Sequence, residues 1–138
     1  MILHCSYEEL NALTAGIERM LAEAGRGGVA APPDVLPDIE ALAPRLTGDL
    51  DLESLAEQQS VERAIEAILA IARESVDEAI LDQHPAAESA VQAYFDFAHT
   101  LTLYERVRLI GEEMRALIEL MTGEPPSEET ASSVQFEE

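Results

Sequence analysis

The sequence contains no lysine, no tryptophan and a single cysteine, Cys5, among its 138 residues. Without lysine the chain cannot form a Schiff base and lacks both a P-loop lysine and a lysine general base. One cysteine cannot form an intrachain disulfide. The absence of disulfides fits either a reducing compartment or a protein that does not depend on the redox state of its compartment. Neither G-x-S-x-G nor H-E-x-x-H occurs, and there are only three histidines. We therefore expect a protein that is not an enzyme and carries no cofactor.

Basic charge is equally scarce. Eight arginines stand against 28 acidic residues, which gives a formal net charge of −20. Direct binding of nucleic acid or of an anionic membrane surface needs clustered Lys and Arg, so neither is an expected partner. The acidic surplus is consistent with a solvated surface or with a patch that binds a basic protein, richest in acids over residues 34–62.

Long apolar runs are also missing. No segment approaches the roughly 20 apolar residues that a membrane-spanning helix requires. The apolar start, residues 1–5, is too short for a signal-peptide core and has no basic region before it. The sequence therefore predicts a cytoplasmic protein, and its length is typical of one domain.

What the sequence does contain is helical periodicity. A capping box of Ser6 and Glu9 begins one helix, Asp51 is the expected N-cap of another, His84-Pro85 marks a hairpin turn, and Gly123 is a stop signal. An all-α fold is predicted, in which a short N-terminal helix accompanies a long antiparallel helical hairpin. The expected helices cover 7–24, 38–46, 52–83 and 86–122, in one domain over 1–123 followed by an acidic tail over 124–138.

The two ends of the chain share a weak strand pattern. Residues 2–5 and 133–136 both alternate loosely between polar and apolar side chains, so the two termini could pair as a small two-stranded ribbon. The alternative is a frayed tail. Gly25 to Gly28 follows a helix and precedes no lysine, so it is interpreted as a linker.

The last long helix carries an apolar seam at heptad spacing, which predicts an interface. At about 55 Å it exceeds the roughly 37 Å diameter of a compact globule of this length, and the first helix spans only about 27 Å. A second copy of the chain, or another protein, would then cover the seam. The first half of this helix has a different apolar face, at Val91, Tyr94, Phe95, Ala98 and Leu101. The seam itself consists of Leu103, Val107, Ile110, Met114, Leu117 and Met121.

A weak metal-site pattern is present in the hairpin. Asp96 and His99 are spaced i, i+3, and Glu62 and Glu66 lie on the preceding helix. A ferritin-like carboxylate site combines such groups, and a dimer axis would supply its second half. Only one acid-x-x-His motif occurs, and helical rise places Glu62 and Asp96 roughly 17 Å apart along a straight hairpin.

The leading hypothesis from the sequence is a non-enzymatic acidic helical interaction protein, either an adaptor, an inhibitor or a small subunit of a larger assembly. Its partner is a protein, a second copy of itself, or both. The alternatives are a ferritin-like metal-binding protein with a site formed across a dimer, and an acidic phosphate-mimic inhibitor of a basic protein.

Overall fold

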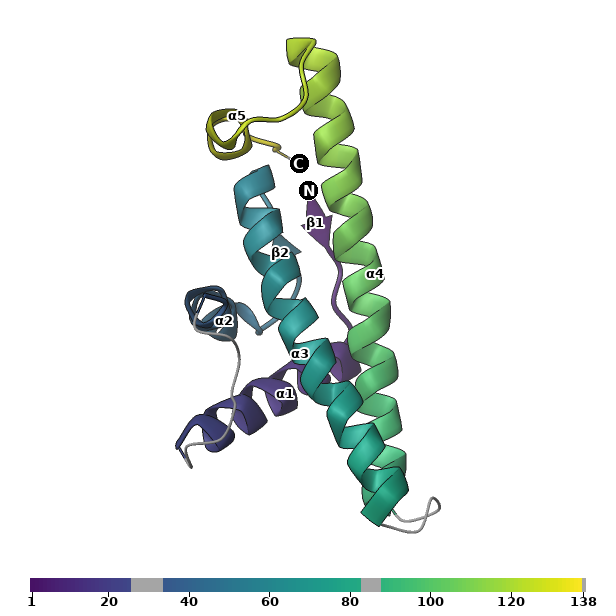
Figure 1. Cartoon of the computed structure of the whole chain (residues 1–138). Helices are drawn as coiled ribbons and strands as arrows, with labels where there is room; N and C mark the ends of the chain where they lie inside the picture. The colour runs from purple at the N-terminus through teal and green to yellow at the C-terminus, as the bar shows by residue number, and fades with distance from the viewer. Residues whose placement is uncertain (26–33, 83–87, 138) are drawn as a thin grey trace.

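The computed structural model describes residues 1–25, 34–82 and 88–137. Its two longest helices, α3 and α4, pack side by side as a hairpin, α1 crosses the second half of α3 and the first half of α4, and α2 lies against α3 (Figure 1). The predicted all-α class with a small two-stranded sheet is confirmed. The elements are β1 (Ile2–Leu3), α1 (Tyr7–Gly25), α2 (Leu36–Leu42), a 3-10 turn η1 (Ala43–Arg45), β2 (Leu50–Asp51), α3 (Leu55–Asp82), α4 (Glu88–Thr122) and α5 (Glu128–Ser133).

Local signals set most helix ends. The Ser6 N–H donates to Glu9 Oε1 at 2.9 Å and the Glu9 N–H donates to Ser6 Oγ at 3.1 Å, which confirms the predicted capping box. Gly123 follows α4 with a φ of 75°, the left-handed conformation that a helix stop favours. Asp51 is not the N-cap of α3, because it belongs to β2; the Oγ of Ser54 accepts the Glu57 N–H instead, at 3.2 Å.

The predicted ribbon forms, but with a different partner strand. β1 pairs antiparallel with β2, with Leu3 opposite Leu50, and not with the C-terminal segment. Of that segment only Ser133 is helical, as the last residue of α5, whose first turn is capped by Ser127; residues 134–136 have no regular secondary structure. The Phe136 N–H then donates to the Glu53 carbonyl at 2.6 Å. Both ends of the chain therefore meet on the segment 50–53, rather than on each other. The predicted hairpin turn at His84-Pro85 and residues 26–28 of the predicted linker lie outside the described residues.

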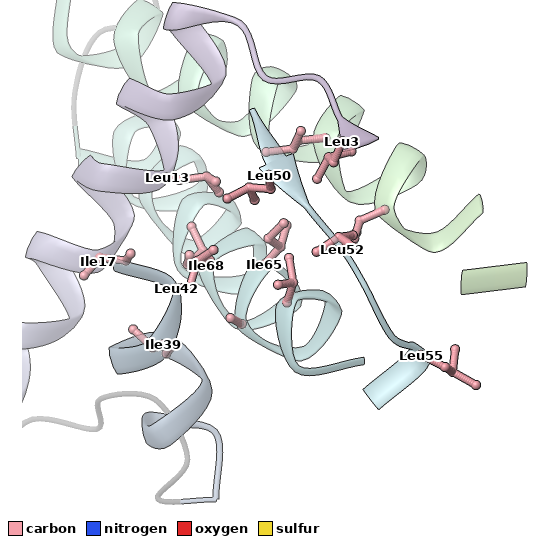
Figure 2. Packing of buried hydrophobic residues seen from close by; sticks show 14 of the residues in the cluster. Leu3, Leu13, Ile17, Ile39, Leu42, Leu50, Leu52, Leu55, Ile65 and Ile68 are labelled. Carbon is pink, nitrogen blue, oxygen red and sulfur yellow. The ribbon is translucent and has the colours of Figure 1, made fainter. Parts of the chain in front are cut away.

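One continuous hydrophobic core joins the elements. Leu3 and Leu50 of the ribbon, together with Leu52 directly after β2, lie beside Leu13 of α1 and Ile65 of α3 (Figure 2). Fully burying each such leucine contributes about 1.5–3 kcal/mol, so the short ribbon is held by its side chains more than by its few backbone hydrogen bonds. Among the described residues, no helix is both long enough and apolar enough to cross a membrane.

The predicted seam of α4 is largely covered by the chain itself. Leu103, Val107 and Met114 are fully buried in the single chain, whereas Met121 is 67% exposed. The expectation that a second copy or another protein must cover these three side chains is therefore wrong. The buried face continues through Gly111 and Ile118 in place of Ile110 and Leu117, both of which are half-buried. A straight helix drifts by about 20° per heptad, so a strict heptad seam rotates out of the core.

Gly111 marks a close approach between the two long helices. Gln58 of α3 is fully buried against it, and the Gln58 Nε2 donates to the Val107 carbonyl at 2.8 Å and to Glu62 Oε1 at 3.2 Å. A Cβ at position 111 would lie 2.4 Å from Gln58 Nε2. Glycine is therefore required here by the neighbouring helix and not by a turn.

Candidate protein-binding surface

The first half of α4 carries an uncovered apolar face, here called the α4 stripe and defined by Val91, Tyr94, Phe95, Ala98 and Leu101. The larger members expose between 36% and 55% of their surface, and Ala98 is also exposed. At 3.6 residues per turn these side chains fall within an arc of about 120° and extend over about 15 Å of helix. The stripe lies on the side of α4 that faces away from the core residues Leu103 and Val107.

An open groove borders the stripe where α1 passes α4. Its volume is about 430 Å³, within the roughly 300–1,000 Å³ of typical ligand clefts. One wall comes from the start of α1 and the other from α4, so both a carboxylate and an aromatic ring line it. The lining residues are Glu8, Asn11, Gln92, Phe95, Asp96 and His99.

The α4 wall of the groove is held in place by local bonds. The Phe95 and His99 rings stack, with centroids 6.2 Å apart and planes at 24°. His99 Nδ1 lies 2.7 Å from the Phe95 carbonyl, and since a carbonyl only accepts, this nitrogen carries the proton. Gln92 Nε2 donates to Asp96 Oδ1 at 2.9 Å. These bonds fix an aromatic face beside a carboxylate.

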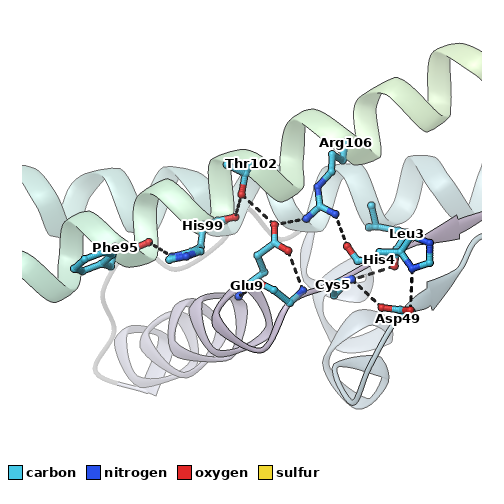
Figure 3. A network of polar contacts seen from close by, with 10 residues as sticks. Leu3, His4, Cys5, Glu9, Asp49, Phe95, His99, Thr102 and Arg106 are labelled. Atoms are coloured by element: carbon cyan, nitrogen blue, oxygen red, sulfur yellow. Dashed lines mark hydrogen bonds and ion pairs between the residues drawn. The ribbon is translucent and has the colours of Figure 1, made fainter.

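The α1 wall is fixed by an ion pair between two residues that are far apart in sequence. Glu9 of α1, which is buried, binds Arg106 of α4 and accepts a hydrogen bond from Thr102 Oγ1 at 3.0 Å (Figure 3). Burial alone would raise the pKa of the Glu9 carboxyl. The hydrogen bonds from Arg106, the Ser6 backbone and Thr102 outweigh burial and hold that pKa below its ordinary value. Glu9 therefore stays ionised and clamps α1 to α4 next to the groove.

The segment before α1 is held by a second polar cluster. Asp49 accepts the Cys5 N–H at 2.9 Å and lies 3.0 Å from His4 Nδ1, while the His4 carbonyl accepts from Arg106 (Figure 3). Burial and the nearby carboxylates of Glu9 and Asp49 raise the pKa of the Cys5 thiol to about 11. The thiol thus stays protonated at neutral pH, which does not suit a nucleophile.

The scarce arginines are used to join elements. Arg19 of α1 pairs with Glu78 of α3, and Arg63 of α3 pairs with Asp38 of α2, both at 3.0 Å. The hydrogen bond from Arg63 lowers the pKa of the Asp38 carboxyl, which keeps the pair ionised. Arg45 likewise reaches Glu57 at 2.7 Å. Because there are only eight arginines for 28 acidic residues, the charges of most carboxylates are not balanced by an arginine of this chain.

The predicted metal candidates separate into two places. Asp96 and His99 line the groove beside α1. Glu62 binds Gln58, and burial together with the charges of Glu66 and Glu62 raises the pKa of Tyr104, which places both glutamates near that ring. Tyr104 lies roughly 12 Å further along α4 than Asp96. Within the described ranges, no group of at least three His, Cys, Asp or Glu side chains is arranged to hold a metal ion.

The sequence contains a signal for the stripe but not for the groove. The change of apolar face along α4 is visible in the spacing of Val91, Phe95 and Ala98, and the structure leaves that face open. The groove depends on where α1 docks, which no local pattern encodes. No protein-family model, curated protein or solved structure matches the chain.

Proposed function

We propose that this protein is a non-enzymatic acidic interaction protein, either an adaptor, an inhibitor or a small subunit of a larger assembly, that binds a protein partner through the α4 stripe. The observation that carries the proposal is the run of half-exposed apolar side chains on the outer face of α4. Contiguous exposed apolar patches with polar surroundings are typical of protein-binding surfaces.

The composition of the stripe supports this proposal. Tyr94 and Phe95 are about half exposed, and aromatic side chains are enriched among the residues that contribute most to binding. They lie on a continuous helix whose opposite face is packed in the core, so the surface is rigid before binding. A rigid surface loses little conformational entropy when a partner binds.

The net charge favours a basic partner over a second copy. Two copies would bring together a combined charge of about −40, and like charges oppose association. A basic protein would instead gain from complementary charge, as the phosphate-mimic hypothesis also requires. We place this interaction in the cytoplasm, in keeping with the free thiol of Cys5.

The test is a comparison of variants as bait. Immobilised wild-type protein, the double variant Tyr94→Asp/Phe95→Asp and the control Leu120→Asp are exposed to the same cell extract, and bound proteins are quantified. Leu120 lies on the same helix, about 37 Å from Phe95, and is 82% exposed. We expect the stripe variant to lose a defined set of proteins that wild type and control retain, in a salt-sensitive manner.

Two further readings complete the test. Circular dichroism must show equal helix content for all three proteins, since every substituted side chain is exposed. Native mass spectrometry reads the oligomeric state of each protein. Retention of the same bound proteins by the stripe variant, together with an unchanged monomeric mass, would refute the proposed function.

A further inference from the structure

The groove beside the α4 stripe indicates what kind of partner the surface accepts. It combines the Phe95 ring with carboxylates from two elements, Glu8 from α1 and Asp96 from α4. Arginine stacks on aromatic faces and binds carboxylates with its planar fork, so this combination matches a guanidinium better than an apolar side chain. The α4 stripe next to it matches an apolar helix face instead.

Resting on the proposed function, we infer that the partner presents a basic amphipathic helix, which lays its apolar face on the α4 stripe and places an arginine side chain in the groove between α1 and α4. Helix-in-groove recognition uses apolar anchors at i, i+3, i+4 and i+7, the spacing at which the stripe itself is built.

Charge around the groove supports this occupant. Arg106, the arginine of the adjoining clamp, is bound to Glu9 and to the His4 carbonyl. Arg19 shares the neighbouring small cavity with Asp96 and pairs with Glu78 at 3.0 Å. The six residues that line the groove include two carboxylates and no arginine. An incoming guanidinium therefore meets acids that no arginine lining the groove neutralises.

The experiment uses a designed probe and the full chain. The probe is an amphipathic helical peptide of about 18 residues, roughly 27 Å long as a helix, with leucines on one face and arginines at its edges. A second peptide carries citrulline in place of every arginine, which keeps the shape and removes the charge. Affinity is measured by fluorescence anisotropy at several salt concentrations.

Matched variants separate the groove from the general negative field. Glu8→Gln/Asp96→Asn and the control Glu112→Gln/Glu119→Gln change the net charge equally, and both control residues are exposed on α4 away from the groove. Asn at position 96 keeps an oxygen that can accept the Gln92 bond. We expect the groove variant to weaken binding of the arginine peptide about tenfold or more, and the control less than about threefold.

Two results would overturn the inference. One is an equal loss of affinity in both double variants, or equal binding of the citrulline peptide, because either would show that the groove selects no guanidinium. The other is a wild-type dimer in native mass spectrometry that Tyr94→Asp/Phe95→Asp dissociates, because a second copy would then occupy the stripe. That second result leaves the proposed function standing, whereas unchanged partner capture by the stripe variant refutes the proposed function itself.

Discussion

The substitution Gly111→Ala sets two effects of opposite sign against each other in the middle of α4. Alanine is favoured over glycine in a helix interior by about 1 kcal/mol. Against this, the new Cβ would lie 2.4 Å from Nε2, 2.6 Å from Cδ and 2.7 Å from Oε1 of Gln58. These distances are too short for any real contact, so the amide of Gln58 has to move.

The surroundings of Gln58 decide which effect is larger. The side chain is fully buried, and its Nε2 is bonded to the Val107 carbonyl at 2.8 Å. Overpacking costs about 1–3 kcal/mol, and the buried Gln58 amide costs about 1–3 kcal/mol more if it loses this bond, whereas the Val107 carbonyl keeps the backbone N–H donor of its own helix. After the helix gain of about 1 kcal/mol is subtracted from this sum of about 2–6 kcal/mol, Gly111→Ala should reduce the free energy of unfolding by about 1–5 kcal/mol.

Equilibrium urea unfolding followed by circular dichroism measures this change. Gly48→Ala is the control, because a Cβ at Gly48 meets nothing within 4 Å. In a Gln58→Ala background the space is open, so Gly111→Ala should become stabilising by about 1 kcal/mol. The double-mutant cycle should thus give a coupling of about 2–6 kcal/mol. An alanine variant as stable as wild type, or equal effects in both backgrounds, would refute the packing of α3 on α4 described above.

Four further predictions concern the clamp, the thiol and the stripe. Arg106→Ala should destabilise the protein at neutral pH by about 1–2 kcal/mol, because it leaves the buried Glu9 carboxylate without its cation. The loss is not larger because the Arg106 side chain is 41% exposed, so solvent screens part of the interaction. Because the folded-state pKa of Glu9 is depressed, its ionised form stabilises the fold above the ordinary pKa of 4.5, and this stability is lost as pH falls through the folded-state pKa. Wild type and Glu9→Gln should therefore converge in free energy of unfolding in acid. A difference between them that does not change with pH would contradict the clamp. Cys5 should react with a thiol-specific disulfide reagent far more slowly at pH 8 than an unfolded control in urea does, and equal rates would argue against a thiol pKa of about 11. Phe95→Asp should leave the free energy of unfolding within about 0.5 kcal/mol of wild type, since half of the ring is already in water, and a larger loss would place the ring in the core.

Helix positions could be predicted because their signals are local. Ser6 and Glu9 lie three residues apart, and Gly123 acts on the turn that precedes it, so neither depends on the rest of the fold. The late part of the α4 core face could not be predicted in the same way. A heptad and a 3.6-residue period agree near Leu103 and Val107 but diverge by Leu117 and Met121, and only packing selects between them.

The second strand of the ribbon and the groove could not be predicted for another reason. Strands of two residues carry too little alternation to identify a partner, so the sequence around Asp51 predicts a helix N-cap in place of β2. The groove exists because Arg106 and Glu9, almost a hundred residues apart in sequence, clamp α1 to α4. The apolar spacing of the α4 stripe was visible in the sequence, whereas its exposure depends on which faces α1 and α3 leave open.

The shared docking of both chain ends on residues 50–53 has a kinetic consequence. The α3–α4 hairpin joins neighbouring segments and can form early, while the contacts of Met1 with Leu52 and of Phe136 with Glu53 close long loops and form late. Elements that depend on one connecting segment open together, so β1, β2 and the residues after α5 should behave as one cooperative unit. Native-state hydrogen exchange should show the Leu52 and Phe136 amides opening with the same free energy, below that of the helical hairpin.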